Sequence, residues 1–497
     1  MPSQCKGALI VGAWGRDTKH LVRFLCCILS LALASCVDFQ PPDVRFVSPT
    51  EGEAVWFKAR YQIEAADKNL DRVDFYLDGA KVRKYEASHI VDSVDVSLAS
   101  HTLRAEAYDR EGNHSSTEVN TVPGDYSPPS VRFVSPTAGE AVLFKVEFEI
   151  EATAESLRRV DFYVDGVKTR TYLDAHIADS VEVSLAPHTL RAEAYDRYGQ
   201  YSYAEVSVAI PAWRCATSSA QWSRRSGHTA VVLDGRIWLM GDVCISGDVW
   251  CSQDGVSWTE VTGSPSWLAR RWHSSLAHGG RIWLFGGDAG SSKNDVWYSV
   301  DGASWTEATD SAGWSPRYSH TSVVFGDSMW VLGGAEGLRS YDNDVWCSAN
   351  GTAWTRATAD AGWSPRCEHA AVVFGGKMWV LGGLGEDGTP RNDVWSSPDG
   401  VTWTLATPSA AWQPRYGHTA VVYDNRIWVL GGDDGGDYRG DVWYSCDGVS
   451  WHLATGSAGW YGDGRTGQAS VVFGDKVWLL GGIIPEGSYC NDVWCWP

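Results

Sequence analysis

The sequence is poor in basic residues, and this limits its possible partners. It contains 41 Lys and Arg against 61 Asp and Glu, which gives a formal net charge of −20. Proteins that bind nucleic acids neutralise phosphates with clustered Lys and Arg side chains. The sequence supplies no such basic stripe, so no nucleic-acid partner is expected.

The apolar segment near the N-terminus lacks the length of a membrane-spanning helix. It covers residues 24–34, which is too few to cross a bilayer. Basic residues precede it, at Arg16, Lys19 and Arg23. This order is typical of a secretory signal peptide.

The apolar segment ends in Leu33-Ala34-Ser35-Cys36, which resembles the bacterial lipobox. The resemblance implies a lipoprotein signal peptide over residues 1–35 and a lipidated Cys36, followed by a short linker to residue 40. It also implies export to the outer membrane or the cell surface, with the lipid as the contact to the membrane. An ordinary secretory signal with an incidental cysteine is the alternative.

Cysteine is absent from residues 41–210, which contain two copies of one pattern. Val44–Thr50 recurs 87 residues later as Val131–Thr137, and His101–Asp109 recurs as His188–Asp196. Apolar and polar residues alternate within each copy, and turn residues separate the alternating runs. This pattern predicts the short strands of a β-sandwich.

The repeated strings resemble bacterial Ig-like domains of surface proteins. The resemblance implies two tandem Ig-like β-sandwiches, over residues 41–124 and 128–210. Without cysteines, the sandwiches would be held by packing alone. They are interpreted as spacers, and a ligand site on their loops is the alternative.

Methionine is scarce, with 4 residues, whereas tryptophan is abundant, with 28. Only Trp14 and Trp56 precede residue 211, which leaves 26 tryptophans for the last part of the chain. There Asp-Val-Trp occurs six times, with 47 to 51 residues between successive tryptophans. Each copy follows an apolar alternation and precedes a turn with another tryptophan, which predicts the four-stranded blades of a β-propeller.

The strings Pro-Arg-x-x-His, Trp-Val-Leu-Gly-Gly and Asn-Asp-Val-Trp resemble the kelch repeat. Six copies imply an all-β fold with a six-bladed kelch-type propeller over residues 211–497. Five blades have a fourth-strand tryptophan, and Trp213 fills the sixth position. An N-terminal outer strand near residues 212–217 is therefore predicted to close the ring with three C-terminal strands. Trp272 and Trp496 lie outside the repeating pattern.

Eight cysteines follow Cys36, and an even number in an exported chain permits disulfides. Two bonds are predicted, between Cys215 and Cys495 and between Cys244 and Cys251. Zinc binding is the alternative, but no Cys-x-x-Cys motif or histidine cluster accompanies these thiols. No metal and no cofactor are therefore expected.

Repetition around the ring separates structural residues from candidate site residues. The recurring Arg and His of Arg-x-x-His are interpreted as core residues, and the recurring Asp of Asp-Val-Trp as a turn or capping group. The arginines are also candidates for the rim of the central channel: Arg317, Arg366, Arg415 and Arg465.

The loops between the Gly-Gly and Asp-Val-Trp strings vary from blade to blade. They offer a mixture of aromatic and polar groups suited to a protein or glycan partner. The candidate binding residues are Tyr341, Asp433, Asp434, Asp437, Tyr438, Arg439 and Tyr489. Solvated loop tips without a partner are the alternative.

Two functions fit these patterns. The first is a surface-anchored lipoprotein whose propeller binds a protein or glycan, and it does not require an enzyme. The second is implied by the resemblance to kelch-type propellers: an extracytoplasmic sugar-active enzyme of epimerase, oxidase or glycosidase type, with its site at the central channel. No acid, base or nucleophile is placed by a motif, so no catalytic residue is predicted. A single acidic or histidine residue near the channel with a shifted pKa would favour the enzyme.

Overall fold

The computed structural model describes residues 40–55, 58–97, 99–124, 127–154, 157–242, 247–337 and 339–497. Within these ranges the chain forms strands and no α-helix, and so no helix there could span a membrane. The predicted signal peptide, Cys36 and Cys244 lie outside the described residues. The chain divides into two compact units, Met1–Thr137 with Glu147–Asp179 and Thr189–Val206, and Ala138–Val146 with Ser180–His188 and Ser207–Pro497.

The two copies of the first repeat each form a smaller and a larger sheet. In the first copy the sheets are β1-β3-β6 (Asp43–Ser48, Lys58–Ala66, His89–Asp95) and β2-β8-β7-β4-β5 (Glu53–Val55, His114–Pro123, His101–Asp109, Leu70–Leu77, Ala80–Tyr85). In the second they are β13-β10-β9 (His176–Glu182, Lys145–Thr153, Ser130–Ser135) and β12-β11-β14-β15 (Val167–Tyr172, Leu157–Val164, His188–Asp196, Tyr201–Val208).

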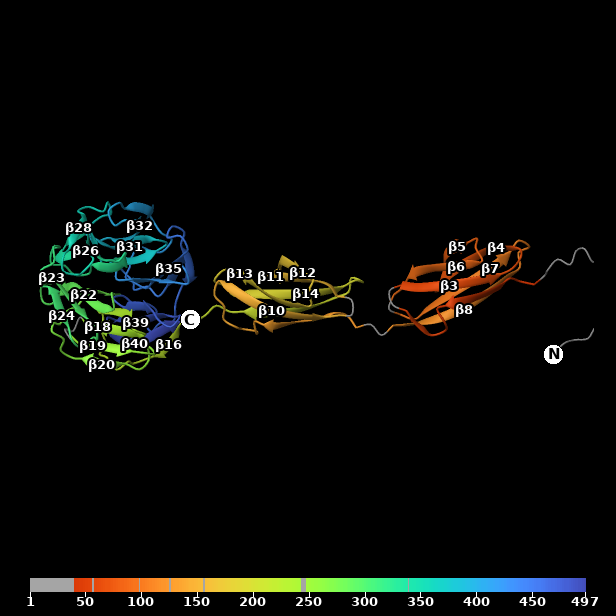
Figure 1. Cartoon of the computed structure of the whole chain (residues 1–497), viewed down its shortest axis with the longest axis horizontal. Helices are drawn as coiled ribbons and strands as arrows, with labels where there is room; N and C mark the ends of the chain where they lie inside the picture. Colours follow the sequence, from red (N-terminus) through yellow and green to blue (C-terminus); the bar gives the residue numbers. More distant parts are fainter. Residues whose placement is uncertain are drawn as a thin grey trace, which may run out of the picture. The chain divides into compact units, whose positions relative to one another are not determined.

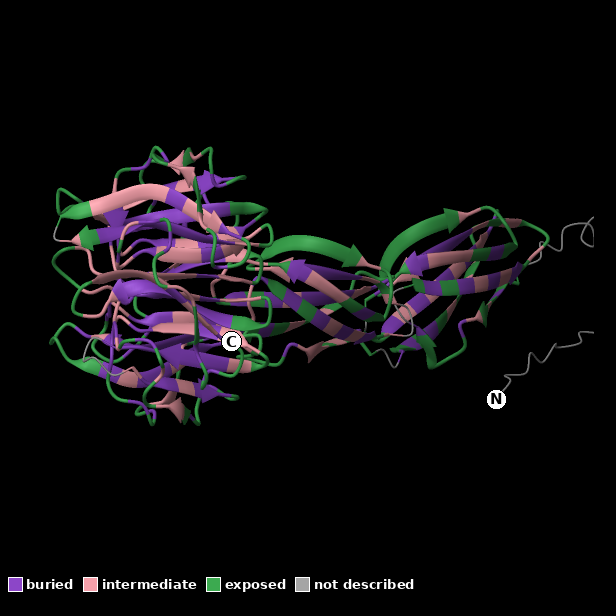
Figure 2. Cartoon of the chain, turned by 60° about the vertical axis from the view of Figure 1, so that its left-hand side comes forward, coloured by how far each residue is buried: buried purple, intermediate pink, exposed green. Residues whose placement is uncertain are grey.

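Alternation of side chains explains how these sheets pack. Along β7 every second residue is buried, from His101 to Asp109, because successive strand residues point to opposite faces. Figure 2 shows the resulting alternation of buried and exposed bands along the strands. Aromatic rings join the two buried faces of each copy: Tyr61 stacks on Phe75 at 4.0 Å, and Phe148 on Phe162 at 4.2 Å.

Residues 211–497, called the head below, form six sheets around a common centre (Figure 1). The first four are β17-β18-β19-β20 (Thr229–Leu233, Arg236–Met240, Val249–Ser252, Thr259–Thr262), β21-β22-β23-β24 (Ser274–His278, Arg281–Asp288, Ser292–Ser299, Thr306–Thr309), β25-β26-β27-β28 (Thr321–Phe325, Ser328–Gly337, Ser340–Ser348, Thr355–Thr358) and β30-β31-β32-β33 (Ala370–Phe374, Lys377–Gly385, Pro390–Ser397, Thr404–Thr407), where β29 (Arg366–Cys367) also pairs with β31.

The last two sheets of the head are β34-β35-β36-β37 (Thr419–Tyr423, Arg426–Leu430, Val442–Ser445, His452–Thr455) and β38-β39-β40-β16 (Ala469–Val472, Val477–Ile483, Tyr489–Trp496, Arg214–Thr217). In the last sheet β16, which precedes all other head strands, pairs antiparallel with β40. The first strand of each sheet contacts the first strand of the next sheet, in the order β17, β21, β25, β30, β34 and β38. The last of them, β38, also contacts β17.

Glycines in the turns of one sheet pack against tryptophan rings of the neighbouring sheet in the head. A Cβ atom at Gly255, in the turn after β19, would lie 2.2 Å from the ring of Trp478 in the last sheet. Four further pairs repeat this contact: Gly302 with Trp238, Gly351 with Trp283, Gly400 with Trp330, and Gly448 with Trp379. The equivalent Trp428 packs instead against Trp496, with ring centroids 4.7 Å apart. Trp496, which lay outside the repeating pattern, therefore has a packing role.

The predicted disulfide between Cys215 and Cys495 is not formed, because the two residues are out of register. Cys215 lies opposite Trp494, whereas Cys495 lies opposite Arg214. A shift of one residue places the two side chains on opposite faces of the sheet. Both thiols are free, and so is the buried Cys251.

Candidate ligand-binding site

Each sheet of the head is braced by one fully buried arginine. Arg465 binds Asp492 through both terminal nitrogens, at 2.9 and 3.0 Å, and its Nη1 also donates to the carbonyl of Gly481 at 3.0 Å. Trp494 donates its indole N–H to the same carboxylate at 2.7 Å. The other pairs are Arg225–Asp248, Arg270–Asp295, Arg317–Asp344, Arg366–Asp393 and Arg415–Asp441.

These contacts correct two expectations from the sequence. Arg317, Arg366, Arg415 and Arg465 are completely buried, so they present no guanidinium at the channel rim. The aspartates of Asp-Val-Trp are ion-pair partners of these arginines and not simple turn residues. A ligand in the channel would meet none of these four guanidinium groups.

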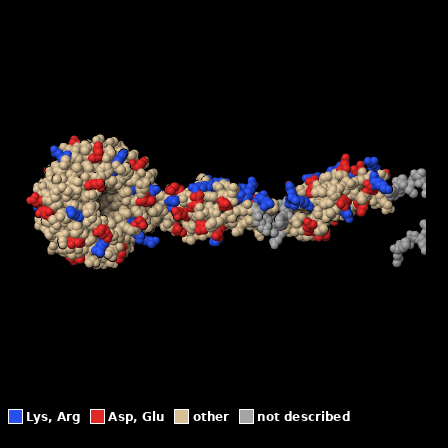
Figure 3. Space-filling model, viewed as in Figure 1, with Lys and Arg blue, Asp and Glu red and all other residues tan. Residues whose placement is uncertain are grey.

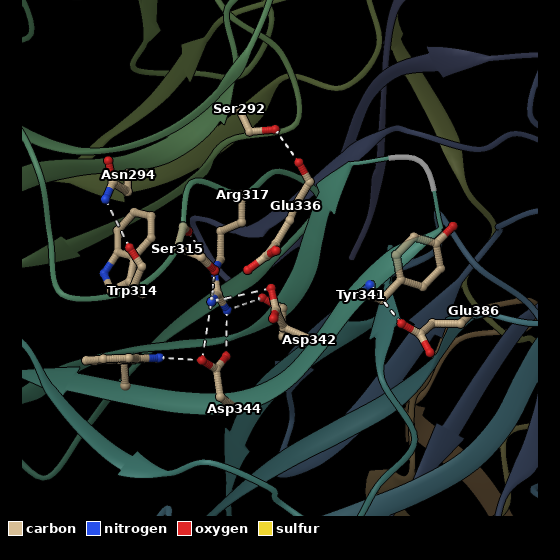
Figure 4. A network of polar contacts seen from close by, with 12 residues as sticks. Ser292, Asn294, Trp314, Ser315, Arg317, Glu336, Tyr341, Asp342, Asp344 and Glu386 are labelled. Atoms are coloured by element: carbon tan, nitrogen blue, oxygen red, sulfur yellow. Dashed lines mark hydrogen bonds and ion pairs between the residues drawn. The ribbon is translucent and has the colours of Figure 1, made fainter.

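Figure 4 shows the pair of Arg317 and Asp344 with the groups around it. A second carboxylate, Asp342, lies 3.4 Å from the same guanidinium. Burial raises the pKa of Asp342 to about 6; Arg317 lowers it, and the charges of Asp344, Glu336 and Glu386 raise it.

Five histidines and Gln468 line the central channel. Burial and, next, the neighbouring arginines lower the pKa of His228, His273, His369 and His418 to about 3, and that of His320 well below its usual value. These rings are therefore uncharged at neutral pH. The hydroxyls of Thr229 and Thr321 bond to His273 and His369 at 2.9 Å.

A closed circle of backbone hydrogen bonds lies directly next to the histidines. The circle has six residues, and each comes directly before one of the five histidines or Gln468 in the sequence. Each of the six donates its N–H to the carbonyl of the member before it in the circle, at 2.8–3.1 Å. All six have a positive φ, between +52° and +63°. The members of this backbone circle are Gly227, Trp272, Ser319, Glu368, Gly417 and Gly467.

Only three members of the backbone circle carry side chains. The left-handed conformation suits glycine, whereas a bulky residue adopts it at a cost of about 1–2 kcal/mol. The three glycines demonstrate that the circle forms without side chains. Trp272 and Glu368 are therefore strained positions whose side chains are not required by the fold, and such outliers cluster at functional sites.

A hollow of about 170 Å³ opens on this circle, lined by its six members and by the adjoining histidines and Gln468. The space-filling view shows a depression at the centre of the head (Figure 3). Trp272 lies beside Tyr318, with ring centroids 5.6 Å apart. The Arg271 guanidinium covers a face of the Trp272 ring at 4.1 Å and bonds to Asp288 at 3.1 Å.

Glu368 is the acidic member of the circle. Burial, and next the charge of Asp433, raise its pKa to about 7. Its Oε2 atom lies over Gly417, 3.2 Å from where a Cβ atom would be placed. Among the residues that the structure describes, none forms a hydrogen bond or ion pair with this carboxylate. The neighbouring Asp433 accepts a hydrogen bond from the Tyr416 hydroxyl at 2.7 Å.

A comparison with family models matches residues 350–496 to the KLHDC2/KLHL20/DRC7 Kelch-repeats domain. The head is a kelch-type β-propeller. Among solved structures, the chain is similar to one titled "Structure of YjhT", at 15% identity and a TM-score of 0.49, over 56% of this chain and 96% of that one. No curated protein matches the sequence.

The kelch propeller distributes the seven predicted binding residues over several places. Tyr341 and Asp433 lie near Glu368, since their charges influence one another. Asp434 forms an ion pair with Arg439 in the same loop as Asp437 and Tyr438. Tyr489 instead lines a separate cavity of about 410 Å³ with Cys215 and Cys490.

Sequence reasoning missed Glu368 at the centre of the kelch propeller. The sequence did contain a signal, in the position directly before each histidine of Arg-x-x-His and before Gln468. Around the ring this position is occupied by Gly, Trp, Ser, Glu, Gly and Gly. Glu368 is the single acid in that column. Within the described residues, no group of three or more potential ligands could hold a metal ion.

Proposed function

We propose that the chain is an exported, lipid-anchored binding protein whose kelch propeller captures a protein or glycan ligand at the end of its central channel. Two Ig-like sandwiches serve as spacers between the anchor and the propeller. The pairing of β16 with β40 supports a closure with one N-terminal and three C-terminal strands. The observation that carries the binding function is the hollow on the backbone circle, with Trp272 and Glu368 in it.

The argument for binding compares equivalent positions within one molecule. The circle has the same backbone conformation and hydrogen bonds at all six positions. Glycine satisfies this structure at three of them, so the fold gives no reason for an indole or a carboxylate at the others. Partly exposed aromatic side chains around a polar group are suited to recognising a ligand.

Glycine substitutions at the circle are expected to separate binding from folding. Trp272→Gly and Glu368→Gly should each weaken binding by at least about tenfold, because a central side chain of the site is removed. Binding would be measured with the full chain on arrays of glycans and of envelope and host-surface proteins. The ligands found there would then be titrated against each variant.

Ser319→Gly is the matched control, since it makes the same backbone change without removing a ring or a carboxylate. Ser319→Gly and Glu368→Gly should keep or slightly raise their melting temperature, because glycine relieves the left-handed conformation. Trp272→Gly gains the same relief but also loses the contacts of its ring with Tyr318 and Arg271. Binding that survives both Trp272→Gly and Glu368→Gly would refute a site at the channel end.

The lipid anchor has its own test at Cys36. Metabolic labelling with a palmitate analogue is expected to label the wild-type chain and not Cys36→Ser, because the thiol is the atom that receives the lipid. The variant should also leave the membrane fraction, since one to three acyl chains provide the affinity for the bilayer. Equal labelling of both chains would exclude a lipid anchor at this residue.

A sugar-active enzyme is the second candidate, and Glu368 favours it. A carboxyl group with a pKa near 7 is suited to exchange a proton at neutral pH. If a sugar ligand is found, its conversion should be followed with the wild-type chain and with Glu368→Gln. Turnover that Glu368→Gln abolishes would establish the enzyme, whereas binding without turnover supports the binding protein.

A further inference from the structure

The hollow at the channel end contains one formal charge, the carboxylate of Glu368. Its other lining side chains are the neutral histidines, Gln468, Ser319 and Trp272, and the remaining lining residues are glycines. The nearest arginines are occupied: the six core arginines bind their aspartates, and Arg271 bonds to Asp288. The hollow is therefore acidic, and within the described residues no cation compensates it.

An uncompensated carboxylate in a partly buried place costs free energy. Such a group either takes up a proton or associates with a cation. The raised pKa of Glu368 corresponds to the first of these outcomes, the uptake of a proton. The same imbalance favours a bound cation, because an opposite charge at close range stabilises the ionised carboxylate.

Aromatic residues also lie near the carboxylate. Trp272 lines the same hollow, and Tyr318, Tyr341 and Tyr416 are close enough for their ionisation to depend on Glu368. Aromatic faces attract organic cations through the ring quadrupole, and Trp is the strongest of them. Arg271 already makes this contact with Trp272, at 4.1 Å.

We infer that the hollow binds a compact organic cation, a protonated amine or a quaternary ammonium group, between the Trp272 ring and the Glu368 carboxylate. This inference rests on the proposed binding function and specifies the chemistry of its ligand. A volume of about 170 Å³ suits a head group and not a long chain. The rest of a larger ligand would then extend over the variable loops.

The site should bind its cation more tightly as the pH rises. The pKa of Glu368 is raised, so the carboxyl is largely protonated below about pH 6 and ionised above about pH 8. The groups that face it are Asp433, which adds negative charge, Cys367 and the tyrosines, whose pKa values are raised, and His369 and His418, whose pKa values are lowered. Protonation of Glu368 is thus the main change expected between these limits.

The test uses calorimetric titration of the full chain with choline and with 3,3-dimethylbutan-1-ol, its uncharged isostere. At about pH 8 choline is expected to bind at least about tenfold more tightly than the alcohol. Its affinity should fall about thirtyfold by pH 5.5, because only the ionised fraction of Glu368 binds well. Choline keeps its charge throughout, so the pH dependence reports on the protein.

Glu368→Gln should remove both the preference for choline and the pH dependence. Asn425→Gly should retain both, because it replaces a left-handed residue in an exposed turn outside the hollow. Equal binding of choline and the alcohol, a pH-independent affinity in the wild type, or no choline binding would each overturn the inference. The array experiment distinguishes the two proposals. An array ligand that requires Trp272 and Glu368, in a chain that does not bind choline, would leave the proposed function standing and refute only the cation.

Discussion

Asp492→Ala is expected to lower the free energy of unfolding of the propeller by about 3–5 kcal/mol, because it leaves a buried guanidinium without its counter-charge. Arg465 is fully buried and Asp492 nearly so, with side-chain exposures of 0% and 9%. The substitution removes two charge-assisted hydrogen bonds from Arg465 and the acceptor of the Trp494 indole. Denaturant unfolding followed by tryptophan fluorescence would measure the loss, since almost all tryptophans lie in the head.

Two further variants decide whether the buried charge is the cause. Asp387→Ala removes the acid of an exposed ion pair with Arg391, and it should have little effect because solvent screens such pairs. Arg465→Met combined with Asp492→Leu removes both charges and should recover part of the stability. A loss no larger for Asp492→Ala than for Asp387→Ala would show that the pair does not brace the sheet.

Gly255→Ala is expected to destabilise the head by about 2–4 kcal/mol. The new methyl group would lie 2.2 Å from the Trp478 ring, so the turn or the indole must move, and overpacking of this kind costs about 1–3 kcal/mol. The left-handed φ of +75° adds about 1 kcal/mol. Because Gly255 and Trp478 belong to the first and last sheets, this variant also tests the contact that joins the two ends of the ring.

Gly235→Ala separates the two contributions. Gly235 has a similar φ of +67°, but no atom lies within 4 Å of an added Cβ. It should therefore show only the conformational cost of about 1 kcal/mol. Equal melting temperatures for Gly255→Ala and Gly235→Ala would mean that the glycine–tryptophan contact does not stabilise the ring.

Local patterns in the sequence were sufficient to predict the strands. The alternation in His101–Asp109 corresponds to the buried and exposed residues of β7, and the kelch-like strings coincide with the strands of the head. Period-two alternation is a property of the strand itself, so it can be read without knowing the neighbours. All-β structure followed from such patterns, and the kelch propeller followed from the resemblance of the repeated strings to the kelch repeat.

Side-chain partners could not be predicted in the same way. The Cys215–Cys495 bond required a register that differs by one residue from that of β16 and β40. Arg317 and its equivalents were candidates for the channel rim, because sequence alone does not reveal that an aspartate 23 to 27 residues later lies against each guanidinium. Both errors concern contacts between segments that are distant along the chain.

Glu368 was missed for a related reason. Its position in the channel arises from the backbone circle, which forms only when six separate segments meet. Tyr341 and Asp433 were predicted from loop variability, and they do lie near Glu368. Loop variability thus indicated two residues that lie near Glu368, whereas the position of Glu368 itself required the tertiary structure.

The backbone circle also determines the electrostatics of the channel end. Each of its six residues donates its N–H to the carbonyl of the preceding member, so these N–H groups are already bonded within the circle. Helix ends attract ions through unpaired N–H groups and aligned dipoles, whereas the circle leaves none of these six N–H groups free for a ligand. One charged side chain therefore sets the polarity of the hollow. Glu368→Lys would make the hollow basic and leave the backbone circle unchanged.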